Sequence, residues 1–210
     1  AQNARILLVP ATDGAIERVL FGAGDKANVN VIGALAQHLP AGDYRIAFSP
    51  REFGATATAI AWGLGAYGFD RYKKRKRPAP LLAPPEGADM AEVDRIVEAS
   101  WLVRDLVNTP TNDMGPIALH AAAEAVAERC GASVEAIVGD DLLTQNYPLI
   151  HAVGRASAEA PRLIHLSWGD AAAPRVAIIG KGVCFDIGGL DLKPSTGMRL
   201  MKKDMGGAAH

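Results

Sequence analysis

Residues 175–210 carry the strongest pattern in the chain and read RVAIIGKGVCFDIGGLDLKPSTGMRLMKKDMGGAAH. The opening residues, 175–180, are almost wholly apolar, which predicts a β-strand buried on both faces. A glycine-rich segment follows this strand at once. Because ligands of open α/β sheets collect beyond the carboxyl ends of the strands, the sequence predicts a functional site within residues 180–210.

Four charged side chains in this segment are the candidate site residues: Lys181, Asp186, Lys193 and Asp204. Glycines surround them, and glycine lets the backbone approach a ligand closely. Carboxylates attract divalent cations. A lysine beside them is either a salt-bridge cation or a neutral amine ligand, since a nearby dication favours loss of its proton. The pattern therefore predicts a metal site, with a salt-bridged loop as the alternative.

The segment closely resembles the leucyl aminopeptidase family, the two-metal cytosolic aminopeptidases, whose motif runs approximately GKGxxFDxGGxxxKPxxxMxxMxxDMGGAA. The resemblance is strongest from Val176 onward, and weaker similarity covers most of the chain upstream, at 69–73, 104–110, 152–157 and 161–163. The residues that match the motif are Gly180, Lys181, Gly182, Phe185, Asp186, Gly188, Gly189, Lys193, Pro194, Met198, Met201, Asp204, Met205, Gly206, Gly207, Ala208 and Ala209.

The resemblance implies a role for each candidate. Asp186 would bridge two divalent metal ions (zinc, manganese or magnesium), and Lys181, as a neutral amine, and Asp204 would complete the inner site. Lys193 would be catalytic, binding the substrate carbonyl and the developing oxyanion. A metal-activated water would attack the scissile carbonyl. The implied enzyme is an aminopeptidase that releases leucine-like N-terminal residues from peptides, and the implied assembly is a homohexamer.

The chain also departs from the family pattern. Cys184, Ile187, Gly197 and Lys203 replace residues that are common there, and none of the four is a proposed ligand. A second family motif, Asn-Thr-Asp-Ala-Glu-Gly-Arg, is absent; it would supply the remaining metal ligands and an arginine that holds bicarbonate. Three ligands cannot saturate two cations that each take about four to six donors. We therefore expect the chain to be the N-terminal portion of a longer enzyme and to be inactive alone.

The rest of the sequence predicts an α/β fold. The expected organisation is a small N-terminal α/β domain at 1–85, a linking helix at 86–108, and the first part of an αβα sandwich catalytic domain at 109–210. Prolines at 78–85 favour a linker, because they suit neither a helix nor a central strand. The expected helices are 27–39, 55–67, 88–107, 116–130 and 140–145, and the expected strands are 5–9, 44–48, 133–138, 162–168 and 175–180.

Composition excludes several classes of protein. The formal net charge is −1, so no global field attracts nucleic acid or an anionic membrane. Two cysteines cannot form a disulfide framework, and Cys184 is expected to be a packed thiol. The longest uncharged stretch, 54–69, is too short to span a bilayer. The expected protein is soluble and cytoplasmic.

Two alternative functions stay open. The run RYKKRKR at 71–77 could make the chain a non-catalytic nucleic-acid-binding protein. A solvated loop is favoured there, because Tyr72 is its one aromatic residue and nucleic-acid binding uses aromatic platforms. The glycine loop at 180–189 could bind a nucleotide or phosphate, but it lacks the GxxxxGK[ST] pattern of a P-loop.

Overall fold

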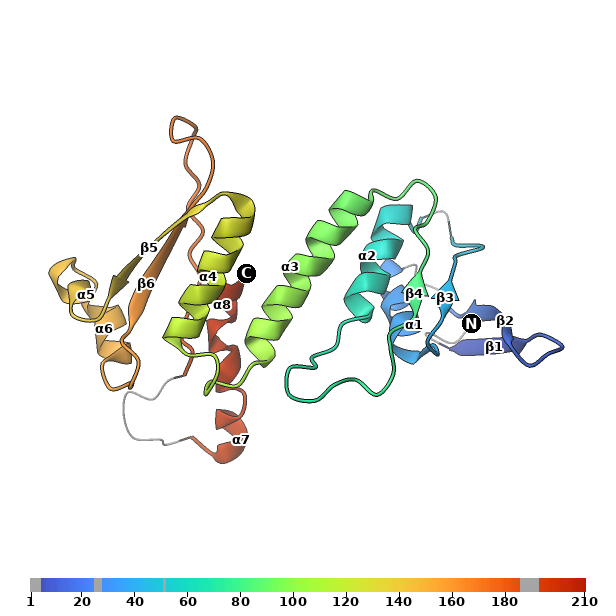
Figure 1. Cartoon of the computed structure of the whole chain (residues 1–210), viewed down its shortest axis with the longest axis horizontal. Coiled ribbons are helices and arrows are strands. Elements are labelled where there is room, and N and C mark those ends of the chain that lie inside the picture. The colour runs from blue at the N-terminus through green and yellow to red at the C-terminus, as the bar shows by residue number, and fades with distance from the viewer. Residues whose placement is uncertain (1–4, 25–27, 51, 186–192) are drawn as a thin grey trace. The chain divides into compact units, whose positions relative to one another are not determined.

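The computed structural model of the chain describes residues 5–24, 28–50, 52–185 and 193–210. They form a mixed α/β fold of short strands and helices, as predicted (Figure 1). The chain divides into two compact units, Ala1–Trp101 and Leu102–His210, and the division falls inside helix α3 (Met90–Asn108). No helix among the described residues has the length and apolar character needed to cross a membrane.

The first unit contains a β-hairpin, a parallel strand pair and two packed helices. In the hairpin, Ile6 lies opposite Phe21. The expected helix at 27–39 is a 3₁₀ turn that continues into a short α-helix. The expected strand at 44–48 is reduced to Asp43–Tyr44, which overlaps it only at Tyr44. The elements are β1 (Ile6–Pro10), β2 (Ile16–Phe21), η1 (Val29–Ile32), α1 (Gly33–His38), β3 (Asp43–Tyr44), α2 (Ala55–Gly65), β4 (Leu81–Leu82) and the first part of α3.

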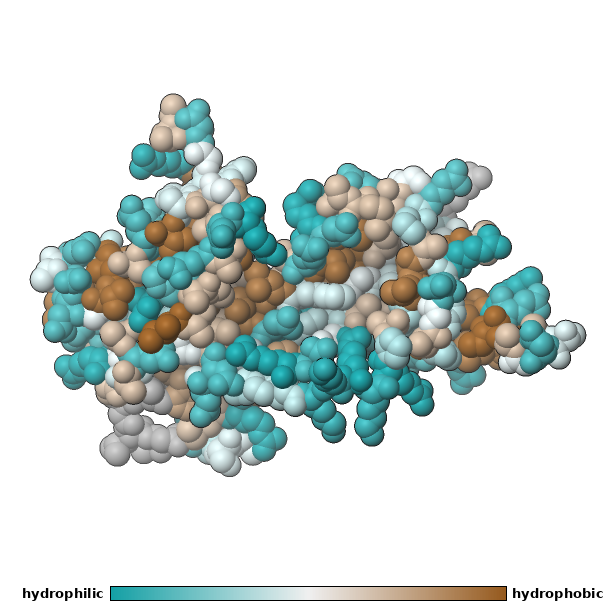
Figure 2. All heavy atoms as spheres, viewed as in Figure 1, coloured by the Kyte–Doolittle hydropathy of each residue, from teal (hydrophilic) through white to brown (hydrophobic). Residues whose placement is uncertain are grey.

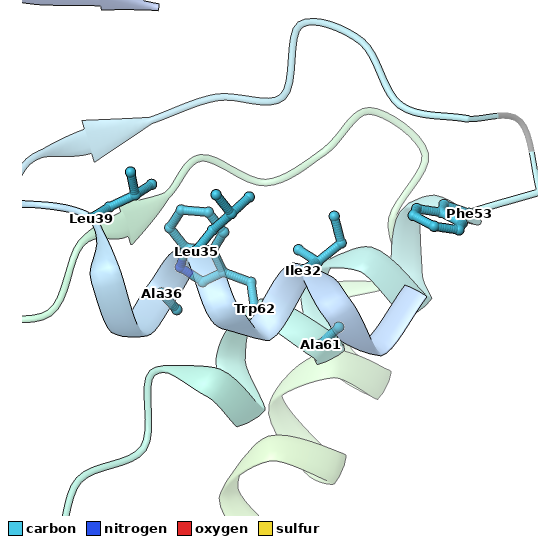
Figure 3. Close-up of a cluster of buried hydrophobic side chains, with 7 residues drawn as sticks. All are labelled: Ile32, Leu35, Ala36, Leu39, Phe53, Ala61 and Trp62. Atoms are coloured by element: carbon cyan, nitrogen blue, oxygen red, sulfur yellow. The ribbon is translucent and has the colours of Figure 1, made fainter. Parts of the chain in front are cut away.

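The core of this unit lies where α1 packs on α2. Glycine is required at this contact, because a Cβ on Gly33 would lie 2.9 Å from the carbonyl oxygen of Ala61. The Trp62 indole fills the space beside α1 and donates a hydrogen bond of 3.3 Å to the carbonyl of Pro80. Figure 3 shows the buried side chains of the cluster, which are Ile32, Leu35, Ala36, Leu39, Phe53, Ala61 and Trp62.

The basic run at 71–77 is an exposed loop between α2 and β4, without helix or strand. Figure 2 shows hydrophilic side chains projecting from this loop. Arg75 attaches the loop to the segment after α2, since its guanidinium donates a hydrogen bond of 2.7 Å to the carbonyl of Ala66. The Arg71 guanidinium lies 5.8 Å from the centre of the Tyr72 ring. The prediction of a solvated loop at 71–77 is confirmed.

The second unit combines a long helix with an antiparallel strand pair. Helix α4 begins at Pro116 and is followed by Gly131 in the left-handed conformation, with φ 66°. This is the expected arrangement, because proline suits the first helical position and glycine suits the position just after the helix end. In the strand pair, Ser133 lies opposite Ser167. The elements after α3 are α4 (Pro116–Cys130), β5 (Ser133–Val138), α5 (Asp141–Thr144), α6 (Pro148–Gly154), β6 (Arg162–Ser167), α7 (Ser195–Met198), η2 (Met201–Met205) and α8 (Gly206–Ala209).

The prediction of a buried strand at 175–180 is wrong for this structure. These residues belong to no helix or strand, and Ile178 and Ile179 are 92% and 95% exposed. An apolar segment becomes a buried strand only when neighbouring strands pair with it and helices cover it. Within the described ranges, β5 and β6 pair with each other and no strand pairs with 175–180. Hydrophobic side chains are also exposed on α5 and α6 (Figure 2).

Candidate metal centre

The candidate site forms where residues 180–182 pack against helix α8. The Ala208 amide donates a hydrogen bond of 2.9 Å to the Lys181 carbonyl. Glycines permit this approach, because a Cβ on Gly207 would lie 2.8 Å from the Lys181 nitrogen and one on Gly180 would overlap the Gly207 carbonyl. Of the described glycines in the proposed nucleotide loop, Gly180 packs against backbone and Gly182 faces the side chains of Ala208 and Leu119. The nucleotide alternative stays untested.

A buried hydrophobic cluster lies beside this contact and includes residues close in sequence to both of its segments. Met205 is completely buried and Cys184 is nearly so, and both pack with Leu106 near the end of α3, Met114 in the following loop and Leu119 in α4. Burial raises the pKa of the Cys184 thiol to about 11, with the Glu159 carboxylate acting in the same direction. The thiol therefore stays protonated at neutral pH, which supports its interpretation as a packed side chain.

Lys181 and Asp204 come together across this packed interface. The Lys181 Nζ lies 3.5 Å from Asp204 Oδ2, and the Lys203 Nζ lies 3.1 Å from Asp204 Oδ1. The Asp204 side chain is 25% exposed, while both lysine side chains are more than half exposed. The hydrogen bond from Lys203, together with the charge of Lys181, holds the pKa of Asp204 below its usual value. Asp204 is therefore an ionised carboxylate with one amine on each oxygen.

The structure describes only one of the other two predicted site residues, Asp186 and Lys193. Asp186 lies outside the described residues. Lys193 is described and exposed, and it comes two residues before α7. In the described part of the chain, no three His, Cys, Asp or Glu side chains gather closely enough to hold a metal ion. The described residues therefore show an ion pair between the Asp204 carboxylate and two lysines, and the metal-binding roles of Lys181 and Asp204 stay predictions.

Two lysines near the site were missing from the sequence prediction. Lys203 forms the ion pair with Asp204 described above, and its departure from the family pattern was the available signal. Lys202 donates a hydrogen bond of 2.9 Å to the carbonyl of Asn108, the last residue of α3. Nothing in the sequence could indicate this partner, because it lies 94 positions away.

Family models match both parts of the chain. The model described as "Cytosol aminopeptidase family, catalytic domain" matches residues 101–210. The model described as "M17 aminopeptidase, N-terminal domain" matches residues 1–85. The two matches together cover nearly all of the described structure, including the segment that holds Lys181 and Asp204.

Individual relatives and solved structures match the same family as the two models. A probable cytosol aminopeptidase of Streptomyces avermitilis is 39% identical, over 94% of this chain and 42% of its own. One of Corynebacterium efficiens is 34% identical, over 97% of this chain and 44% of its own. The crystal structure of cytosol aminopeptidase from Coxiella burnetii matches 98% of this chain and 45% of its own, with a TM-score of 0.88 and 44% identity. The bottromycin maturation enzyme BotP in complex with Mn matches with a TM-score of 0.75 and 32% identity, over 98% of this chain and 48% of its own. The chain thus spans less than half the length of these proteins.

Proposed function

The chain belongs to the cytosol aminopeptidase family, and from this premise we propose that it is part of a metal-dependent aminopeptidase that releases leucine-like N-terminal residues from peptides. The observation that carries the proposal is the 3.5 Å approach of Lys181 to Asp204 inside the segment that matches the catalytic-domain model. The two residues lie 23 positions apart in the sequence, and the close backbone approach at Gly180 and Gly207 brings their segments together.

The donor set fits one side of a two-metal centre. Asp204 would give a carboxylate oxygen and Lys181 a neutral amine nitrogen, and Asp186 is the proposed bridging ligand. A nearby dication lowers the pKa of an amine, so Lys181 would lose its proton when metal binds. When bound, the metals, which we propose to be zinc, manganese or magnesium, would supply an activated water and polarise the scissile carbonyl. A manganese complex of the related BotP supports this metal class.

Lys193 has a different proposed role. The residue is exposed, and its side chain would donate a hydrogen bond to the substrate carbonyl oxygen. Such a donor stabilises the negative charge that develops on that oxygen during attack. The same lysine would orient the peptide so that its free N-terminal amine can bind one of the metal ions, which would make the enzyme an exopeptidase.

The wider proposal follows the family. We propose that 1–85 form an N-terminal domain, 86–108 a linking helix and 109–210 the first part of the catalytic domain. The remaining metal ligands and a bicarbonate-binding arginine would come from residues beyond this sequence, so the 210 residues alone would be inactive. We also propose a homohexamer in the cytoplasm that acts on peptides.

Three variants of the full-length protein test the activity. Lys193→Ala should lower kcat on leucine amide at least a hundredfold, since loss of one oxyanion donor typically costs 10²–10³ in rate. Asp186→Asn would replace the proposed bridging carboxylate by a neutral amide and should lower kcat by at least as much. Lys76→Ala, in the exposed basic loop of the first unit, removes a charge more than 100 positions before the motif in the sequence and should keep full activity. A chelator should abolish turnover, and added zinc, manganese or magnesium should restore it. Near-normal turnover of both site variants would refute the proposal.

A further inference from the structure

We propose that Lys202 is a positioning residue that fixes the turn carrying Asp204 to the end of helix α3. The proposal rests on the proposed function, in which Asp204 is a metal ligand. It concerns a residue that does not contact the metal or the substrate and acts through its neighbour.

The contact is made to a polar helix end. The Lys202 Nζ donates a hydrogen bond of 2.9 Å to the Asn108 carbonyl and lies 3.5 Å from Asn108 Oδ1. The last carbonyls of a helix lack partners within the helix and carry partial negative charge. An ammonium placed there satisfies one of these carbonyls, and hydrogen bonds from a charged donor are stronger than neutral ones. The lysine is partly buried, which shields the bond from water.

The helix end that receives Lys202 is itself held in place. Thr109, the next residue, is 2% exposed, and its hydroxyl donates a hydrogen bond of 2.7 Å to the Asp105 carbonyl. Leu106, one turn back, packs into the cluster around Met205. Lys202 is therefore attached to a fixed point and not to a mobile loop.

Asp204 lies between the anchors of its own turn. In η2 (Met201–Met205), the first and last methionines are buried, and Lys202 adds a polar attachment on α3. Residues two apart in a 3₁₀ turn lie on different sides of it, so Lys202 can bond to the helix while Asp204 meets Lys181. If Lys202 were lost, the two hydrophobic anchors would remain but the rotation of the turn about them would be less constrained.

The test compares three variants in the full-length protein. Lys202→Met keeps an unbranched side chain of nearly the same length and removes the charge, whereas Lys202→Arg keeps the charge and a donor. Arg199→Met is the matched control, since it removes one cation from an exposed residue three positions earlier. The readouts are Mn²⁺ affinity by titration calorimetry, amide hydrogen exchange in residues 201–209, and kcat and KM on leucine amide.

We expect Lys202→Met to weaken Mn²⁺ binding at least tenfold, in line with the 10–100-fold losses seen when residues that orient metal ligands are replaced. Exchange in 201–209 should accelerate, and kcat should fall more than KM rises. Lys202→Arg should stay within threefold of the parent protein, and Arg199→Met should leave exchange in 201–209 unchanged.

Three results would overturn the inference. The first is a Mn²⁺ affinity of Lys202→Met within twofold of that of the parent protein. The second is an equal loss of Mn²⁺ affinity in Arg199→Met, and the third is exchange in Lys202→Met that is accelerated throughout 102–210 and is equally accelerated in Lys202→Arg. Failure of the proposed function looks different, because the parent protein itself would then fail to bind Mn²⁺ or to hydrolyse leucine amide. The exchange comparison would still decide the role of Lys202 in that case.

Discussion

Replacing Gly207 by alanine probes the backbone contact on which the candidate site is built. A Cβ at this position would lie 2.8 Å from the Lys181 nitrogen and 3.3 Å from the Lys181 oxygen. Both neighbours are backbone atoms, so the strain cannot be relieved by rotating a side chain. The two segments must separate, and the hydrogen bond from Ala208 to Lys181 must lengthen.

Gly206→Ala is a matched control in the same helix, α8 (Gly206–Ala209). Its Cβ would lie 3.6 Å from Val107 Cγ2, which is an ordinary van der Waals contact. Both substitutions gain up to about 1 kcal/mol from the better helix propensity of alanine. The difference between the variants therefore isolates the clash, which overpacking measurements place at about 1–3 kcal/mol.

The assay is urea unfolding of both variants, followed by circular dichroism. With a slope of about 2 kcal/mol/M, the Gly207→Ala midpoint should lie roughly 0.5–1.5 M below that of Gly206→Ala. The Gly207→Ala protein should also lose kcat/KM on leucine amide, because Lys181 moves away from Asp204. Midpoints that agree within about 0.2 M would refute the view that this close approach shapes the site.

Three further predictions concern the residues around the turn. Met205→Ala should destabilise the protein by about 2–5 kcal/mol, because Met205 is fully buried; urea unfolding measures this, and a loss below about 1 kcal/mol would contradict it. Iodoacetamide at pH 8 should label the exposed Cys130 rapidly and leave Cys184 unlabelled until the protein unfolds, because burial raises the pKa of Cys184 to about 11. Peptide mass spectrometry distinguishes the two cysteines, and equal labelling of both would be inconsistent with a buried Cys184 thiol. The folded-state pKa of Asp204 is lowered by a hydrogen-bonded ammonium group, so its stabilising contribution is present above the unfolded value of about 3.9 and is lost as pH falls through the folded value. The stability difference between the parent protein and Asp204→Asn should therefore shrink as pH falls below about 4, and a difference that is constant with pH would exclude this ion pair as its source.

Local patterns predicted the three longest helices well, α2, α3 and α4, and did not predict the short helices α6 and α7. Helix α4 is bounded as expected, because a proline at the first helical position and a glycine at the left-handed position act within a few residues of the chain. Long-range partners were harder to predict. The strand expected at 175–180 is absent because apolar composition indicates burial but does not specify which strand supplies the hydrogen bonds. Strand β2 was overlooked, although Gly14, with φ 83°, follows an aspartate in the turn before it.

The candidate site was also predicted in part, from local motif residues but not from long-range contacts. The motif identified Lys181 and Asp204 as partners, and the structure places them 3.5 Å apart. It could not reveal Lys202, because a lysine that binds a helix end has the same sequence signature as a solvated one. Asp186, the residue that the motif makes central, lies outside the described residues, so its bridging role stays a prediction.

We expect that the exposed loop at 71–77 can be cleaved without the first unit falling apart. Six of its seven residues are lysine or arginine, so a trypsin-like protease would find its cleavage sites concentrated between α2 and α3. Cutting there would not separate these helices. The Trp101 indole donates a hydrogen bond of 3.0 Å to the Gly63 carbonyl, and the space above Gly63 is filled by Val97. A nicked protein should therefore migrate as two fragments in denaturing gels and as one particle in solution.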